Sequence, residues 1–579
     1  MRKLFTMILL CAAVQGTLAQ ASPDNGSEKI DWRDARITDV GVVVSQVERI
    51  IRTDSITGQR DTTYNVYPDE VVWQSDGTDV FDSLSVCNAA RARSRAKRAP
   101  TQGPTAQSGN LMSDYLSGFS YYVFSFDYPS IDADGKEIML SAMCACPPKG
   151  KTVNNVVLGT HITITADRER PSTHFKNYDA DDWGMLFSLA AGPKLILNGK
   201  YQAIVLAANI GSGLLNIVLP GIGALVQLGL TAVEIEQIKK AAGYHDYDYD
   251  LVIMPDYEGY GLTVQRAHPY LYQELTARQC VDGMRYGKSL YSNDPALKYI
   301  RGSLRSDYRC FSCGYSQGGS VAMACHRFIE QNNLGSELHF VGSICGDGPY
   351  DPMATLMYYM QQEQAGNPMG MSVVLPLIVK GMLDTNPYML CHTAEEYFRP
   401  EFLETGIMDW LASKKYSTTD IDNLWTNYAK DHPGAINYKS AHVSEIMNDE
   451  CYAYFTKLYN DNKNTFTSAA GIPLPAHRGL IEDLHFALAS NDMTSGWSPS
   501  KSIQLFHSKG DKVVPYVNAE RAKNALGNKV NLETAKNGLD HGDSGVDFFK
   551  GDDLMDLGLK RWLNLRLYDY VSSICKENY

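Results

Sequence analysis

Short apolar segments alternate with helical segments along most of the chain, and this alternation limits the possible folds more than any other feature. A helical period covers 271–290. The segments typical of buried strands are 153–159, 251–254, 308–313, 340–345 and 503–506. Buried strands that alternate with helices favour a largely parallel sheet covered on both faces. We therefore expect an α/β fold, and the absence of any fixed-period repeat excludes propellers and solenoids.

The sheet is expected to begin with an antiparallel hairpin. Residues 121–126 and 138–143 are both strand-like, and they flank the sequence Asp132-Ala133-Asp134-Gly135. Asp and Gly supply the backbone conformations that a tight turn needs.

Composition shifts divide the chain into a leader, an extension, an α/β domain and a cap. The leader ends near a small-residue site, the linker is rich in Pro, Gly, Gln and Ser, and the cap is rich in Met, Tyr, Leu and Trp. The predicted parts are a signal peptide at 1–19, an N-terminal extension and linker at 20–110, an α/β domain at 111–351 and 500–579 with an apolar insertion at about 184–240, and a helical cap at 352–499.

The N-terminus predicts export. Arg2 and Lys3 precede the apolar run 4–14, and small residues occupy the positions before a cut after Ala19. This order of a charged region, an apolar region and small residues is typical of a secretory signal. We expect a secreted, periplasmic or cell-surface protein, with a membrane anchor as the alternative.

The charge balance argues against nucleic acid as a partner. Lys and Arg number 53 against 66 Asp and Glu, so the net charge is −13. An acidic surface repels phosphate backbones, and the one basic run, at 91–98, is best explained as a solvated linker. Hydrophobic residues at 44% indicate an ordinary globular protein.

The sequence Gly314-Tyr315-Ser316-Gln317-Gly318 matches G-x-S-x-G, and its context makes the match informative. The predicted strand 308–313 runs into it, and the helix-like segment 321–325 follows. A serine on such a strand–turn–helix needs small flanking residues, because its backbone is strained and the helix packs closely. Ser316 is therefore the candidate nucleophile.

A serine hydroxyl needs a base, and the base needs a carboxylate to orient it. Asp511 follows the strand 503–506, and His541 follows a further short strand, so the order Ser, Asp, His is kept. Asp347 and Asp351 are alternative acids. His507 lies beside Asp511 and is expected to be structural.

An acyl-transfer site also needs two backbone amides for the developing oxyanion. Gln317, directly after the serine, is expected to supply one of them. Ile162, in the loop after the strand 153–159, is the choice for the other. His161 is expected to be structural, with a role as a second base as the alternative.

Neither a cofactor nor a metal is expected. Cys310 and Cys313 have CxxC spacing, and Cys144 and Cys146 flank one residue, but no second pair lies at zinc-site distance. These cysteines are predicted to be buried thiols, with one or two disulfide bridges in the chain.

Residues 201–233 contain no charged side chain, and Pro220 divides them. Each piece is too short to span a bilayer, so an apolar helical hairpin is expected. Three roles remain open for it: ordinary core, a wall of an acyl pocket, or contact with a membrane surface.

The triad segments, 314–319, 511–515 and 540–542, resemble those of α/β-hydrolases. The sequences Pro255-Asp-Tyr-Glu-Gly-Tyr-Gly261, His268-Pro-Tyr270 and Cys345-Gly-Asp-Gly-Pro-Tyr-Asp351 resemble the secretory lipase branch more narrowly, and the similarity spans about 119–575. The chain departs from the branch in the segment 201–233 and in lacking a His-Gly pair at His161. The resemblance implies an α/β-hydrolase fold and a small-molecule or lipid ester substrate.

We therefore expect a serine hydrolase that cleaves carboxylic esters through Ser316, His541 and Asp511. A serine peptidase on the same fold is the first alternative, because the same triad cleaves amides. A non-catalytic exported surface protein is the second alternative.

Overall fold

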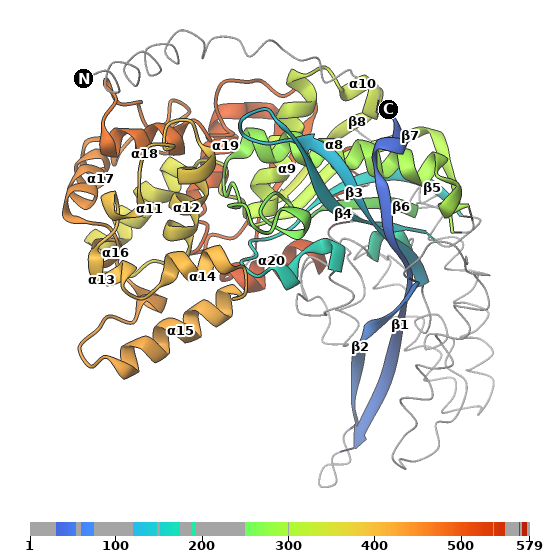
Figure 1. Cartoon of the computed structure of the whole chain (residues 1–579), viewed down its shortest axis with the longest axis horizontal. Helices are drawn as coiled ribbons and strands as arrows, with labels where there is room; N and C mark the ends of the chain where they lie inside the picture. The colour runs from blue at the N-terminus through green and yellow to red at the C-terminus, as the bar shows by residue number, and fades with distance from the viewer. Residues whose placement is uncertain are drawn as a thin grey trace, which may run out of the picture.

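A ten-stranded sheet forms the centre of the computed structural model (Figure 1). The structure describes residues 30–53, 60–74, 120–147, 151–173, 188–191, 249–298, 300–535, 538–550, 567, 570, 571 and 573–575. In order across the sheet, the strands are β10 (Val530–Thr534), β9 (Ser502–His507), β8 (Phe340–Gly346), β7 (Ser303–Tyr315), β5 (Thr152–Thr160), β6 (Tyr249–Pro255), β4 (Glu137–Cys146), β3 (Ser120–Ile131), β1 (Arg36–Thr53) and β2 (Arg60–Gln74).

The sheet has a parallel half and an antiparallel half. Strands β10, β9, β8, β7, β5 and β6 are parallel to one another. Strands β4, β3, β1 and β2 then pair antiparallel, and β3 and β4 form the expected hairpin around the turn at 132–135. β1 and β2 extend the sheet at its N-terminal edge as a long two-stranded arm (Figure 1). The predicted α/β fold is confirmed, and the arm adds two strands to it.

Alternate side chains of each strand point to opposite faces of the sheet. Both faces carry apolar side chains, and helices cover each of them. Phe124 and Leu158 face a core shared with α8 (Gln273–Asn293), α9 (Gln317–Gln331) and α19 (Val517–Leu526). Val123 and Val157 face the other core, which includes Phe548 of α20 (His541–Lys550). The short helix α10 (Gly335–Leu338) leads into β8.

The residues between β8 and β9 form helices with a core of their own, which includes Phe402 and Trp425. These helices lie to one side of the sheet (Figure 1). They are α11 (Pro352–Gln364), α12 (Val374–Thr385), α13 (Pro400–Leu403), α14 (Ile407–Ser413), α15 (Thr418–Asp431), α16 (Val443–Ile446), α17 (Asp449–Asn462) and α18 (Leu480–Ala489). We call them the cap helices.

Several sequence-based predictions fall outside the described residues. They are the leader at 1–19, the basic run at 91–98 and the apolar segment 201–233. Among the helices that the structure describes, none combines the length and the apolar character that a bilayer crossing requires. The ten described cysteines form no disulfide bridge with one another, so the predicted bridges are not found within this part of the chain, and Cys391 is the exposed cysteine among them.

A buried ion pair connects the cap helices to the sheet domain. Arg521 of α19 is 1% exposed and contacts Asp351, at the start of α11, and Asp492, which lies 3.0 Å from its Nη2. Asp351 also caps α11 by accepting a hydrogen bond from the Ala354 amide. The guanidinium therefore fixes α11 against α19.

We expect Arg521→Ala to lower the free energy of unfolding by about 3–5 kcal/mol, because it leaves buried carboxylates without a counter-charge. Arg305→Ala is the matched control, because Arg305 pairs with Asp307 on the surface and such pairs contribute at most about 1 kcal/mol. Urea unfolding checks both variants. Equal midpoints for the two would contradict the assignment.

Candidate active site

Ser316 sits on a strained turn between β7 and α9. Its φ and ψ are 58° and −127°, a region that residues other than glycine rarely adopt. A Cβ added at Gly318 would lie 2.1 Å from the Thr160 carbonyl oxygen, and one at Gly314 would lie 2.2 Å from Thr160 Oγ1. Only glycine fits at both positions, because the end of β5 packs directly against the turn.

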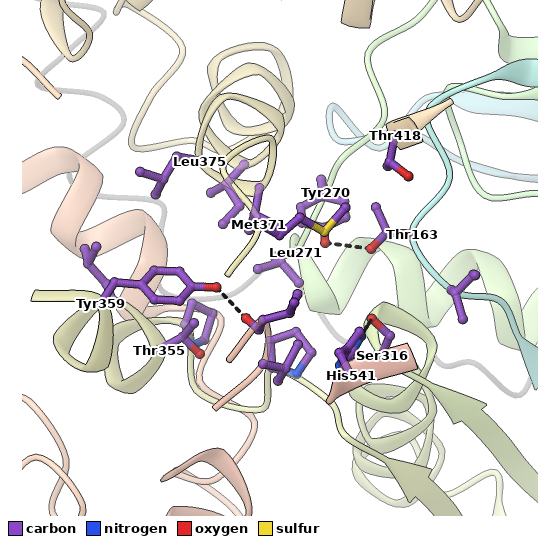
Figure 2. A pocket seen from close by; sticks show the side chains of 18 of the residues that line it. Thr163, Tyr270, Leu271, Ser316, Thr355, Tyr359, Met371, Leu375, Thr418 and His541 are labelled. Carbon is purple, nitrogen blue, oxygen red and sulfur yellow. Dashed lines mark hydrogen bonds between the residues drawn. The ribbon is translucent and has the colours of Figure 1, made fainter. Parts of the chain in front are cut away.

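His541 lies within hydrogen-bond distance of the serine. Its Nε2 is 2.9 Å from Ser316 Oγ, and its Nδ1 is 2.6 Å from Asp511 Oδ2 (Figure 2 shows the first of these). The other carboxylate oxygen of Asp511 accepts hydrogen bonds from the amides of Val513 and Val514. The structure thus brings together the three residues selected from the sequence. His541 is the first residue of α20 rather than part of a loop.

The charges of the pair reinforce each other. Burial opposes ionisation of Asp511, but His541 and the Val514 amide outweigh burial and lower the pKa of Asp511. Burial likewise opposes protonation of His541, but Asp511, and then Asp347 and Asp540, outweigh burial and raise the pKa of His541 above its ordinary value. Asp511 is therefore ionised at neutral pH, and His541 is a stronger base than a free histidine.

Asp347, one of the two alternative acids, lies beneath this pair. Carboxylate or ring atoms of Asp347, Asp511 and His541 all lie within 4.8 Å of one another. The Tyr315 hydroxyl is 3.0 Å from Asp347 Oδ2 and 2.5 Å from the His541 carbonyl oxygen. Burial, together with the charge of Asp511, raises the pKa of Asp347 to about 6. Asp511, and not Asp347, makes the hydrogen bond to the histidine.

These three residues are also the one group with metal-ligand geometry among the residues that the structure describes. Both ring nitrogens of His541 are already within hydrogen-bond distance of Ser316 and Asp511. The arrangement therefore suits proton transfer, and a metal would have to displace one of these contacts.

The remaining alternatives have other partners. Asp351 contacts Arg521, and His507 Nε2 lies 2.8 Å from the Val514 carbonyl oxygen. His161 is fully buried, with ring nitrogens near the carbonyl oxygens of Ile162 and Asp256. Burial lowers the pKa of His161 to about 4.

The two backbone amides expected for an oxyanion lie on adjoining elements. Gln317 opens α9, so its amide has no acceptor within the helix. Ile162 follows β5, and a Cβ added at Gly318 would lie 2.8 Å from the carbonyl oxygen of His161, the residue before it. The loop that carries Ile162 therefore packs against the first turn of α9.

A cavity of about 190 Å³ opens at Ser316 and extends toward the cap helices. Figure 2 shows Ser316 and His541 at one end and Leu375, Met371 and Tyr359 toward the other. Its lining is mostly apolar. Apart from the tyrosines, His541 is the one residue with an ionisable side chain among the described residues that line the cavity. From the cap these residues include Leu356, Met371, Val374, Leu375, Ile378, Val379, Leu484 and Leu488.

Sequence reasoning did not assign the cavity to these helices. A pocket wall is one of the three roles open for 201–233, which lie outside the described residues, whereas α12 contributes Val374, Leu375, Ile378 and Val379 to the lining. The signal for α12 was the uncharged apolar run 373–379. Tyr315 was also missed, although it is the variable residue before the serine in G-x-S-x-G.

The order β3-β4-β6-β5-β7-β8-β9-β10, with β4 antiparallel to both neighbours and a serine turn after β7, is that of the α/β-hydrolase fold. The predicted fold class is therefore confirmed.

No protein-family model and no curated sequence matches the chain significantly. Among solved structures, the rice cell wall degrading esterase LipA from Xanthomonas oryzae has a TM-score of 0.48 at 20% identity, covering 78% of this chain and 90% of that one. Candida antarctica lipase A in its closed state has a TM-score of 0.42 at 14% identity, covering 74% and 75%.

Removing the Asp347 charge is expected to lower the pKa of His541. The base must be neutral to act, so activity falls as the pH drops through that pKa, and Asp347→Asn should move the acid limb of kcat/KM to lower pH by up to about one unit. Asp543→Asn is the control, because Asp543 is an exposed residue of α20, the helix that begins at His541. This variant should leave the acid limb in place. An acid limb that moves to higher pH in Asp347→Asn, or by the same amount in both variants, would contradict the proposed effect of the Asp347 charge on His541.

Proposed function

We propose that the chain is an exported serine hydrolase that cleaves carboxylic esters. The observation that carries the proposal is the chain of contacts from Ser316 Oγ to His541 Nε2, at 2.9 Å, and from His541 Nδ1 to Asp511 Oδ2, at 2.6 Å, at the mouth of an apolar cavity. Export is part of the proposal because of the leader-like residues 1–19.

The chemistry follows from these contacts. His541 takes the proton from Ser316 as the serine oxygen attacks the acyl carbonyl carbon. The negative charge that forms on the carbonyl oxygen is held by the amides of Gln317 and Ile162. Collapse of this intermediate expels the alcohol, which takes the proton from His541. Water then repeats the sequence on the acyl-enzyme and releases the acid.

Asp511 keeps His541 in the tautomer with its proton on Nδ1, which leaves Nε2 free to accept the serine proton. It also stabilises the imidazolium that forms in each half-reaction. The raised pKa of His541 strengthens it as a base but requires a pH above that pKa for activity.

The cavity favours esters of apolar acids over peptides. A peptide brings many polar groups that need partners on burial, whereas the cavity walls named above are apolar and the described polar lining is mainly hydroxyl groups. At roughly 10–15 Å³ per water-sized group, a cavity of about 190 Å³ has room for about 13–19 such groups, enough for a medium or long acyl chain.

Ser316→Ala should lower kcat by roughly 10⁴-fold or more, with little change in thermal stability, and His541→Ala should cost nearly as much. The double variant should lose little further activity, because the residues act as a unit. Hydrolysis of nitrophenyl esters, assayed beside aminoacyl-nitroanilides, measures this. Loss of activity in Asp347→Ala with full activity in Asp511→Ala would reject the acid assignment, and cleavage of the anilides alone would favour a peptidase.

The acyl pocket predicts a chain-length preference. Six more methylenes, at about 0.8 kcal/mol each when buried, should give an octanoyl ester at least a tenfold higher kcat/KM than an acetyl ester. Ile378→Trp, which fills the cavity from α12, should remove this preference while acetate turnover persists. Asp384→Trp, at an exposed position of the same helix, is the control. A preference for acetate in the parent enzyme would exclude the acyl pocket.

A further inference from the structure

A buried stack of three rings lies behind the candidate site, and none of the three takes part in the proton transfers proposed for Ser316 and His541. His161 and Tyr257 are stacked with centroids 3.8 Å apart, and Tyr257 and His268 are nearly parallel at 5.7 Å. All three side chains are at most 2% exposed. Tyr257 holds a φ of 64°, and a Cβ at Gly259 would lie 2.6 Å from the His268 backbone. The turn between β6 and α8 is thus shaped around His268.

One end of the stack holds the side chain of Gln317. His268 Nδ1 lies 2.9 Å from the Glu258 carbonyl oxygen, which only accepts, so Nδ1 carries the proton. Nε2 then accepts a hydrogen bond from the Gln317 side-chain amide at 2.8 Å. Burial, with the charge of Lys414, lowers the pKa of His268 well below its ordinary value, which keeps the ring neutral and Nε2 an acceptor.

The other end of the stack holds the loop around Ile162. The Tyr257 hydroxyl donates to the His161 carbonyl oxygen at 3.2 Å, and His161 Nε2 is 3.2 Å from the Asp256 carbonyl oxygen. On the far side of Ile162, the hydroxyls of Thr163 and Tyr270 are 2.8 Å apart (Figure 2). The residues on both sides of Ile162 are therefore attached to the segment 256–270 that carries His268.

We propose that His268 is a positioning residue that sets the spacing of the two oxyanion amides, by holding Gln317 through its side chain and the Ile162 loop through Tyr257. The inference rests on the proposed function and adds to it a residue that touches neither substrate nor triad. Gln317 and Ile162 belong to different elements, and this chain of side-chain contacts links them in addition to the backbone packing of Gly318 against Thr160 and His161.

This role makes a specific kinetic demand. Oxyanion donors act on charge that is present in the transition state and absent in the ground state, so misplacing them lowers kcat and leaves KM nearly unchanged. A histidine that served stability alone would change the unfolding midpoint without this selectivity.

The experiment uses the full-length enzyme and the octanoyl ester. His268→Phe keeps a ring in the stack and removes the acceptor, and Gln317→Met keeps the backbone amide and removes the donor. Each should lower kcat about 10- to 100-fold with KM within twofold, and each should weaken inhibition by an octyl trifluoromethyl ketone, whose serine adduct carries the oxyanion, by a similar factor. The double variant should be little worse than the single ones, because both changes break the same bond.

His326→Phe is the matched control. His326 is a fully buried histidine of α9 with partners Ser343 and Glu330, away from the serine turn. It should lower thermal stability and leave kcat within twofold.

Unchanged kcat in Gln317→Met and in a folded His268→Phe would overturn the positioning role, as would a loss of activity carried by KM. If His268→Phe does not fold, Gln317→Met tests the same bond alone. Ester hydrolysis that survives Ser316→Ala, or no hydrolysis by the parent chain, would instead overturn the proposed function itself.

Discussion

The contact between the end of β5 and the turn at Ser316 is the constraint on which the rest of the site depends. Thr160 lies so close that neither Gly314 nor Gly318 could carry a side chain. This contact places the serine turn at the carboxyl ends of the parallel strands, and it also brings the Ile162 loop against the first turn of α9. The candidate nucleophile and the two candidate oxyanion amides are therefore located by one packing contact.

The histidines of the site lie in two different electrostatic environments. Asp511 and His541 stabilise each other's charged forms, while Asp347 adds a second carboxyl group beneath them whose pKa burial raises to about 6. Behind the loop that carries Ile162, burial has the opposite effect on histidine: it lowers the pKa of His161 and of His268 and holds both rings neutral. A charged imidazole is thus favoured at one histidine and disfavoured at two others a short distance away.

Much of this was predictable from local patterns. The strand and helix around Ser316, the strands before Asp511 and His541, and the hairpin at 132–135 all have strong local signals in composition and spacing. The pairing of β6 between β4 and β5 was not predictable, because it is a contact between segments about a hundred residues apart. The hydrogen bond from Gln317 to His268 and the contribution of α12 to the cavity lining were not predictable either, since nothing in either local sequence indicates its partner.

The insertion of the cap between β8 and β9 determines the order in which the protein can be completed. Ser316 lies in the first part of the α/β domain, whereas Asp511 and His541 follow the cap in sequence. A chain emerging from the ribosome therefore presents Ser316 long before His541, and β8 remains an unpaired edge until β9 has been made. Open edges of this kind invite association with other chains. The serine turn is thus made first, and the candidate triad is complete only when the strands that follow the cap have joined the sheet.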